Sequence, residues 1–120
     1  MDVKKVLESI EQETRTSRCQ DAKADHGKPR PSLVPPEAIL AIAEVRAYGT
    51  DKYGSSDNWR MVEPERYIDT LYRHLLAVVE RGLDSSDEES HLPHIWHIAT
   101  NAAFLCAMLY DNDMKAGLDL

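Results

Sequence analysis

Apolar residues recur along this chain every three or four positions, which is the spacing of helices that turn one face toward a core. Four segments show this pattern, at residues 2–14, 36–48, 64–82 and 87–110. No segment alternates apolar and polar residues one by one, as a half-buried strand would. The pattern therefore predicts an all-α fold, a helical bundle.

Proline and glycine set the expected ends of these helices. A proline opens the second and the third segment, Gly49 follows the second, and the third ends at Gly82. Residues 14–36 hold four prolines, so we expect an irregular arm that wraps the domain or carries ligand contacts. Residues 49–63 are rich in Gly, Ser, Asp and Asn and predict an ordered loop.

The fourth segment carries histidines where a simple core helix would have only apolar residues. On one helix, His94, His97 and Asn101 share a face, and two imidazoles at this spacing form half of a site for Mn, Fe or Zn. Alternatively, both rings are hydrogen-bonded core or interface residues. The segment itself is either one long helix capped by Ser86 or a short turn followed by a helix.

Further polar groups lie on the third segment and in the acidic link that follows it. In an antiparallel hairpin, Asp69, Arg73 and His74 would approach the histidine face, a mixture that suits a metal ion and a phosphate together. The alternative is a solvated face with ordinary ion pairs. Asp87 and Glu89 supply oxygen ligands for a divalent ion, or serve only as acids at a helix N-terminus.

Basic and aromatic residues of two loops suit a nucleotide. Cationic side chains contact phosphate, an aromatic ring stacks on a base, and asparagine reads a base edge. The phosphate candidates are Lys28, Arg30 and Lys52, and the base candidates are Tyr53, Asn58 and Trp59. The chain contains no P-loop, no GxGxxG turn and no GxSxG elbow, which argues against several familiar nucleotide-binding and hydrolase architectures.

Composition narrows the class of protein. The 14 Lys and Arg against 21 Asp and Glu give a net charge of −7, which disfavours binding to a nucleic-acid polymer. Two distant cysteines without CxxC spacing favour a reduced, cytoplasmic protein, and Cys106 is expected in the core. No run of 18 apolar residues and no secretion signal is present, so we expect no membrane association.

Four stretches together resemble a phage and prophage family of dATP/dGTP diphosphohydrolases, which includes MazZ-type enzymes and is related to MazG-like all-α pyrophosphohydrolases. They read GKPRPSLVPPEAI, YGTDKYGSSDNW, YIDTLYRHLLAVVERG and DEESHLPHIWHIATNAAFL. The resemblance leaves residues 1–22 outside and makes 23–120 one catalytic helical domain. It implies hydrolysis of dGTP or dATP to the monophosphate and pyrophosphate with Mg²⁺ or Mn²⁺, in some phages to supply DNA that contains 2-aminoadenine.

The chain departs from the MazG-like pattern, in which ExxE and ExxD pairs bind the metal. His94 and His97 stand where the Glu and Asp of ExxD would be, and residues 64–82 hold no ExxE. Either the imidazoles replace the carboxylates, or the carboxylates lie upstream and the histidines handle phosphate or protons. From the chemistry that such a reaction needs, we assign metal binding and water activation to residues among Asp69, His74, Asp87, Glu89, His94 and His97. The expected substrate contacts are Lys28, Arg30, Lys52, Tyr53, Asn58, Trp59, Arg73 and Asn101.

Three helices make an incomplete bundle, so we expect a homodimer or homotetramer. The expected contact is the apolar face formed by Ile95, Ile98, Ala102 and Cys106. Two other functions stay open: a non-catalytic helical protein that senses nucleotide or binds a partner, and a dNTP triphosphohydrolase.

Overall fold

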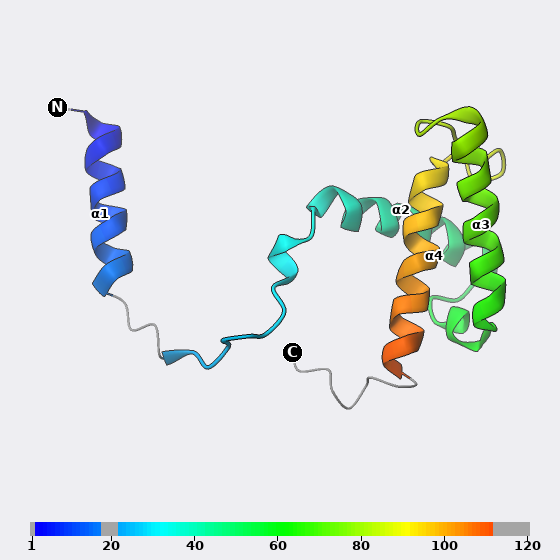
Figure 1. Ribbon diagram of the computed structural model, residues 1–120, viewed down its shortest axis with the longest axis horizontal. Coiled ribbons are helices and arrows are strands. Elements are labelled where there is room, and N and C mark those ends of the chain that lie inside the picture. The colour runs from blue at the N-terminus through cyan, green and yellow to red at the C-terminus, as the bar shows by residue number, and fades with distance from the viewer. Residues whose placement is uncertain (1, 18–21, 112–120) are drawn as a thin grey trace.

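The computed structural model describes residues 2–17 and 22–111, and over these residues the chain is all-helical, as predicted (Figure 1). Its only extended feature within the described part is an isolated bridge between Ser86 and Pro93. No described helix is long and apolar enough to span a bilayer. The elements are α1 (Val3–Ser17), the 3₁₀ turn η2 (Pro31–Leu33), α2 (Pro36–Tyr53), the 3₁₀ turn η3 (Asn58–Met61), α3 (Pro64–Arg81) and α4 (His94–Leu109).

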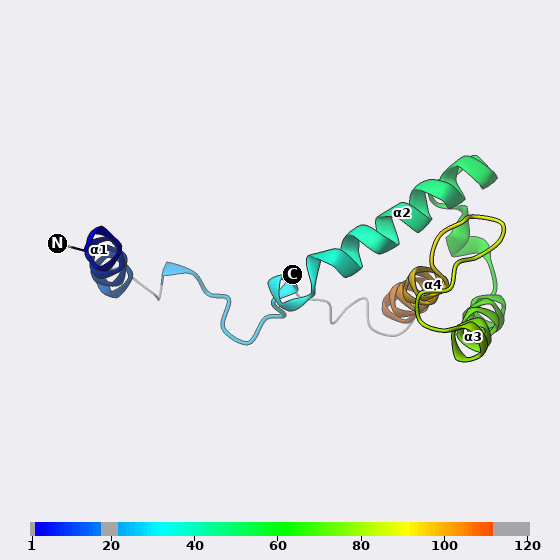
Figure 2. The ribbon, with the colours of Figure 1, turned by 90° about the horizontal axis from the view of Figure 1, so that it is seen from above.

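The body of the protein is an antiparallel α3–α4 hairpin crossed by α2. Figure 1 shows α3 and α4 side by side, and Figure 2 shows α2 running across them; α4 contacts both other helices and also η3. Helix α1 lies apart from this body in both views. The hairpin that was expected to bring the two polar faces together is therefore present.

Two predicted helix boundaries were wrong. Helix α2 continues through Gly49 to Tyr53, because glycine inside a helix costs only about 1 kcal/mol. It ends at Gly54, whose φ of 70° is the left-handed conformation that terminates helices, with its N–H donating to the Thr50 carbonyl at 2.8 Å. Lys52 and Tyr53 therefore belong to the last helical turn and not to a loop. Helix α1 likewise extends to Ser17, beyond the predicted end at residue 14.

The fourth segment is a turn followed by a helix, the second of the two predicted alternatives. Helix α4 begins at His94, and the preceding loop is closed by the His94 N–H donating to Ser85 O at 2.9 Å and the Asp87 N–H donating to Leu92 O at 2.8 Å. Ser86 does not cap the helix, because it pairs with Pro93 in the isolated bridge. Asp87 and Glu89 consequently lie in a loop that folds back over the start of α4.

The buried part of the described chain is largely polar. Its buried polar residues are His94, His97, Thr100 and Asn101, all on α4, whereas the buried apolar residues are Ala41, Val45 and Met108. The expectation that Cys106 lies in the core was wrong, because this residue is exposed. The predicted histidine face is thus the face that α4 turns inward.

Candidate active site

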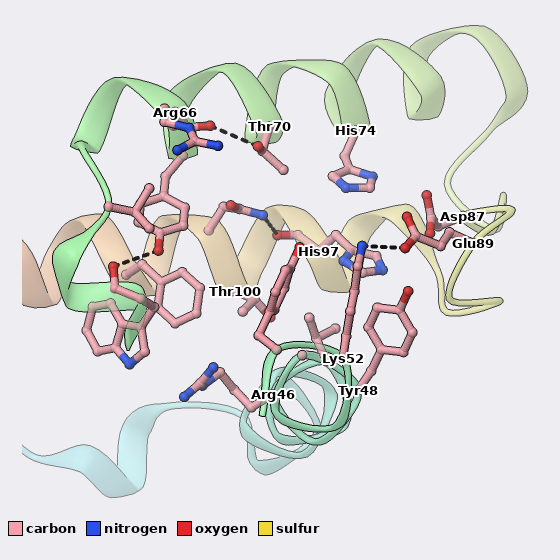
Figure 3. A pocket seen from close by; sticks show the side chains of 18 of the residues that line it. Arg46, Tyr48, Lys52, Arg66, Thr70, His74, Asp87, Glu89, His97 and Thr100 are labelled. Carbon is pink, nitrogen blue, oxygen red and sulfur yellow. Dashed lines mark hydrogen bonds and ion pairs between the residues drawn. The ribbon is translucent and has the colours of Figure 1, made fainter. Parts of the chain in front are cut away.

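A pocket of about 780 Å³ lies between α2, α3 and α4, beside the loop that joins α3 to α4. Side chains of α3 and of α2 reach toward each other across it (Figure 3). Its volume falls within the range of small-molecule sites. The lining residues from α3, which repeat at helical spacing along one face, are Arg66, Tyr67, Asp69, Thr70, Arg73 and His74.

Three imidazoles meet at one end of this pocket. His74 Nδ1 lies 2.7 Å from His94 Nδ1, and the His74 ring stacks on His97 with centroids 4.5 Å apart and an interplanar angle of 8°. His97 Nε2 lies 2.7 Å from the Ser90 hydroxyl of the loop. Because His94 and His97 are three residues apart on α4, both face His74 on the antiparallel α3.

Burial keeps the imidazoles of His74 and His97 neutral. It lowers the pKa of His74 to about 4, helped by His97 and opposed by Asp87, and it also lowers the pKa of His97. Burial alone would raise the pKa of Asp87, but hydrogen bonds from Ser90, including its N–H at 2.8 Å, outweigh burial and lower it. At neutral pH His74 and His97 are therefore neutral and Asp87 is ionised, the protonation states in which these side chains ligate metals.

The depressed pKa of His74 gives a pH dependence of stability with a definite sign. In the unfolded chain this imidazole takes a proton near pH 6.5, whereas in the fold it stays neutral until about pH 4. Since the unfolded state binds more protons in this interval, His74 lowers the free energy of unfolding as the pH falls from 6.5 to about 4.

Urea denaturation in EDTA at pH 7.5, 6, 5 and 4.5 should therefore show a larger loss for the wild type than for His74→Gln. Titrating groups that do not interact with His74 are shared by both chains and cancel in the comparison. Equal losses would mean that the imidazole is not held neutral by the fold.

The donor set fits a divalent cation. His74, Asp87 and His94 each offer a ligand atom, and these atoms lie within 4.8 Å of one another. His94 Nε2 is buried and has no hydrogen-bond partner, which is costly for a polar atom unless something else binds it. Two imidazole nitrogens and one carboxylate oxygen suit Mn²⁺, Zn²⁺ or Fe²⁺ better than Mg²⁺.

A salt bridge between α2 and the α3–α4 loop closes one side of the pocket. Lys52 Nζ donates to Glu89 Oε1 (Figure 3), and this pair raises the pKa of Lys52 and lowers that of Glu89. Both side chains are exposed to solvent, which screens their attraction, so the pair adds little to stability. Its effect is to place a cation and an anion at the rim beside the histidines.

Aromatic rings form the other end of the pocket. The rings of Trp59 and Phe104 stack at 4.5 Å between centroids, and the Tyr67 ring, whose hydroxyl donates to Trp59 O at 2.7 Å, lies 5.0 Å from Phe104. The guanidinium of Arg60 covers Trp59 at 4.4 Å, and that of Arg46 covers Phe104 at 5.1 Å. A base that stacked on Trp59 would have to displace Arg60.

Most predicted site residues line this one pocket. Lys28 and Arg30 do not, because they lie in the segment before α2; His94 joins the cluster through His74 without lining the pocket itself. The predicted residues in the lining are Lys52, Tyr53, Asn58, Trp59, Asp69, Arg73, His74, Asp87, Glu89, His97 and Asn101.

Sequence reasoning missed part of the aromatic end. Phe104 follows Asn101 by three residues on α4, so helical spacing alone would have placed it on the same face. Arg66 and Tyr67 also line the pocket, and they lie within about one helical turn of Asp69 and Thr70 on α3. For Arg46 the sequence holds no comparable signal, because its place depends on how α2 crosses α4.

The fold and the site together define an all-α protein in which histidine and aspartate side chains that could bind a metal ion lie at one end of the pocket. The chain belongs to the family described as dATP/dGTP diphosphohydrolase, N-terminal, which matches residues 18–116. It is 37% identical over 87 residues to a protein of Salmonella phage PMBT28 named dATP/dGTP diphosphohydrolase. The aligned part is 72% of this chain but only 29% of that relative's length. No solved structure matches the chain.

Proposed function

We propose that this chain forms the active site of a hydrolase that converts dGTP or dATP to the monophosphate and pyrophosphate. The main observation behind the proposal is that the two ends of the pocket differ: aromatic rings line one end, and imidazoles with carboxylates line the other. A nucleoside triphosphate differs between its ends in a matching way, with a flat base at one end and a charged triphosphate at the other. Family membership and the name of the phage relative support this choice of substrate.

In this proposal the triphosphate lies toward the histidine end. Lys52 and Arg73 line that region and bind phosphate oxygens, while His74, Asp87 and His94 would hold Mn²⁺ or Mg²⁺. A bound divalent cation would offset the charge of the phosphates.

The proposed proton acceptor is Asp69, which lies on α3, whereas the other two carboxylates of the pocket lie in the α3–α4 loop. Asp69 lines the pocket four residues before Arg73 on the same face of α3, and it takes a proton from the attacking water. Glu89 is less suited to this role because it is paired with Lys52. His97 is oriented by Ser90 and stacks on His74, which positions the cluster.

The partner in this proposal is a small deoxynucleotide in the cytoplasm and not a nucleic-acid polymer. Formation of dGMP would serve phage nucleotide metabolism that leads to 2-aminoadenine in DNA. The chain is proposed to act as a homodimer or homotetramer, and its relation to MazG-like enzymes remains a prediction from the sequence motifs.

Product analysis tests the activity. The full chain is incubated with each dNTP and NTP in Mn²⁺, Mg²⁺ or Co²⁺, and the products are separated by anion-exchange chromatography. We expect dGMP or dAMP with pyrophosphate, and no turnover in EDTA. Inorganic triphosphate with a deoxynucleoside would identify a triphosphohydrolase instead, and nucleotide binding without any product would identify a sensor.

A further inference from the structure

Two guanidinium groups lie at the aromatic end of the pocket. Arg46 and Arg66 both line the pocket, and Figure 3 shows both of them away from Asp87 and Glu89. Burial raises the pKa of the Tyr67 hydroxyl, and the charges of Arg46 and Arg66 oppose this shift, so both guanidinium groups lie near that ring. The aromatic end therefore presents hydrogen-bond donors beside its rings.

The guanidinium of Arg46 is held directly at these rings. It donates a hydrogen bond to the carbonyl of Ser56, in the loop after α2, and its Cζ lies 5.1 Å from the centroid of the Phe104 ring. Among the described residues, no carboxylate forms an ion pair with Arg46. A guanidinium has five N–H donors, and the bond to Ser56 uses one of them. Arg46 can therefore donate to a ligand.

The two purines differ in what they present to such donors. On the edge that carries N7, guanine offers two acceptors, O6 and N7, whereas adenine offers the acceptor N7 and a donor, its N6 amino group. Arginine has only donors, so it matches guanine with two hydrogen bonds and sets a donor against the amino group of adenine. Glutamine has a donor and an acceptor and matches adenine instead.

We infer that Arg46 is a specificity-determining residue that selects guanine over adenine. The inference rests on the proposed function, in which the base of a deoxynucleoside triphosphate binds at the aromatic end. An entering base stacks on Phe104 in place of the guanidinium, because stacking is typically stronger than the contact of a partly exposed cation with a ring. The displaced guanidinium, still attached to α2, lies at the edge of the base and donates to O6 and N7. The preferred substrate is then dGTP.

The competing role for Arg46 is a contact with phosphate, which a guanidinium also suits. Its contact with Phe104 argues against this role, because the imidazole and carboxylate groups that could bind a metal ion lie at the other end of the pocket. Arg66 is the less direct candidate for the base, since it lies over no aromatic ring of the described residues. The two roles differ in outcome: loss of a phosphate contact weakens both purine nucleotides alike, whereas loss of a base contact changes their ratio.

Binding of two nucleotides that resist hydrolysis tests the inference. Calorimetry in Mn²⁺ gives the dissociation constants of the full chain for the α,β-methylene analogues of dGTP and dATP. We expect the wild type to bind the dGTP analogue about tenfold more tightly, the scale of one bidentate contact. Arg46→Gln should bind the dATP analogue at least as tightly as the dGTP analogue. Arg46→Lys keeps a side chain with donors only and should keep the preference for guanine.

The matched control is Arg60→Gln. This variant removes the same group from over the neighbouring ring of Trp59, at a residue that does not line the pocket, and should keep the wild-type ratio. A further test needs no variant and decides if Arg46→Gln does not fold. The 7-deaza form of the dGTP analogue keeps O6 but has a C–H group in place of N7, so the wild type should bind it about fivefold more weakly.

Several results would overturn the inference. These are equal affinity of the wild type for the two analogues, a preference for dATP, no binding of either, and full affinity for the 7-deaza form. The inference also fails if Arg46→Gln keeps the wild-type ratio, as a phosphate contact predicts, or if Arg60→Gln changes the ratio as much. Binding is measured without turnover, so the two proposals can fail separately. Monophosphate and pyrophosphate with an unchanged ratio overturn only the role of Arg46, and a changed ratio without products overturns only the hydrolysis.

Discussion

Replacing Asp87 by asparagine is expected to weaken Mn²⁺ binding at least about tenfold and to lower dGTP turnover roughly 100-fold, the scale on which altered metal ligation acts. Asparagine keeps an oxygen that accepts the Ser90 N–H, which lies 2.8 Å from Asp87 Oδ2, so the loop should keep its shape. What is lost is the negative charge in the group formed with His74 and His94. Free Mn²⁺ is measured by electron paramagnetic resonance, and products are separated by chromatography.

The neighbouring residue supplies the control. Glu88 belongs to the same acidic loop, but its side chain is 92% exposed, lies outside the pocket and faces Arg81 at 4.0 Å. Glu88→Gln removes the same charge one position away and should leave Mn²⁺ binding and turnover unchanged. If the two variants behave alike, the loop acts through its general charge, and the cation site at Asp87 is ruled out.

Local periodicity was enough to predict the helices and the histidine face. His94, His97 and Asn101 lie on one helix, so their common direction follows from 3.6 residues per turn and needs no tertiary information. The approach of His74 to this face could be predicted too, because a short link between two helices makes them antiparallel neighbours. That hairpin brings His74 Nδ1 to 2.7 Å from His94 Nδ1.

Features that depend on competition between local signals were not predictable. Two glycines, Gly49 and Gly54, both stand near the end of α2, and composition alone does not decide which one adopts the left-handed conformation. The loop before α4 was equally ambiguous, since Ser86 with Glu89 has the spacing of a capping box but is held in a bridge with Pro93.

Features that depend on how helices cross were also out of reach. The place of Arg46 over the Phe104 ring requires the angle at which α2 passes α4, which no local pattern encodes. The same holds for Lys28 and Arg30, whose basic character suits phosphate but whose segment runs away from the pocket (Figure 1). Residue type therefore indicated which side chains suit phosphate, but not which of them line the pocket.

Replacing Phe104 by alanine is expected to lower the free energy of unfolding by about 2–3 kcal/mol and to weaken dGTP binding about tenfold. The ring is half-buried and contacts Trp59, Tyr67 and the Arg46 guanidinium, so its loss removes packing on three sides, somewhat less than a fully buried ring would lose. The weaker binding follows because a base that displaced the Arg46 guanidinium would stack on the Phe104 ring, an interaction worth about 1–3 kcal/mol.

Phe104→Leu separates these two effects. Leucine keeps most of the apolar volume, so the free energy of unfolding from urea denaturation should fall by less than about 1.5 kcal/mol. It has no aromatic face, so dGTP affinity, measured by calorimetry in Mn²⁺, should fall about as far as in Phe104→Ala. Wild-type affinity in Phe104→Leu would show that the ring only packs the end of the pocket, and the base would then have to bind elsewhere along it.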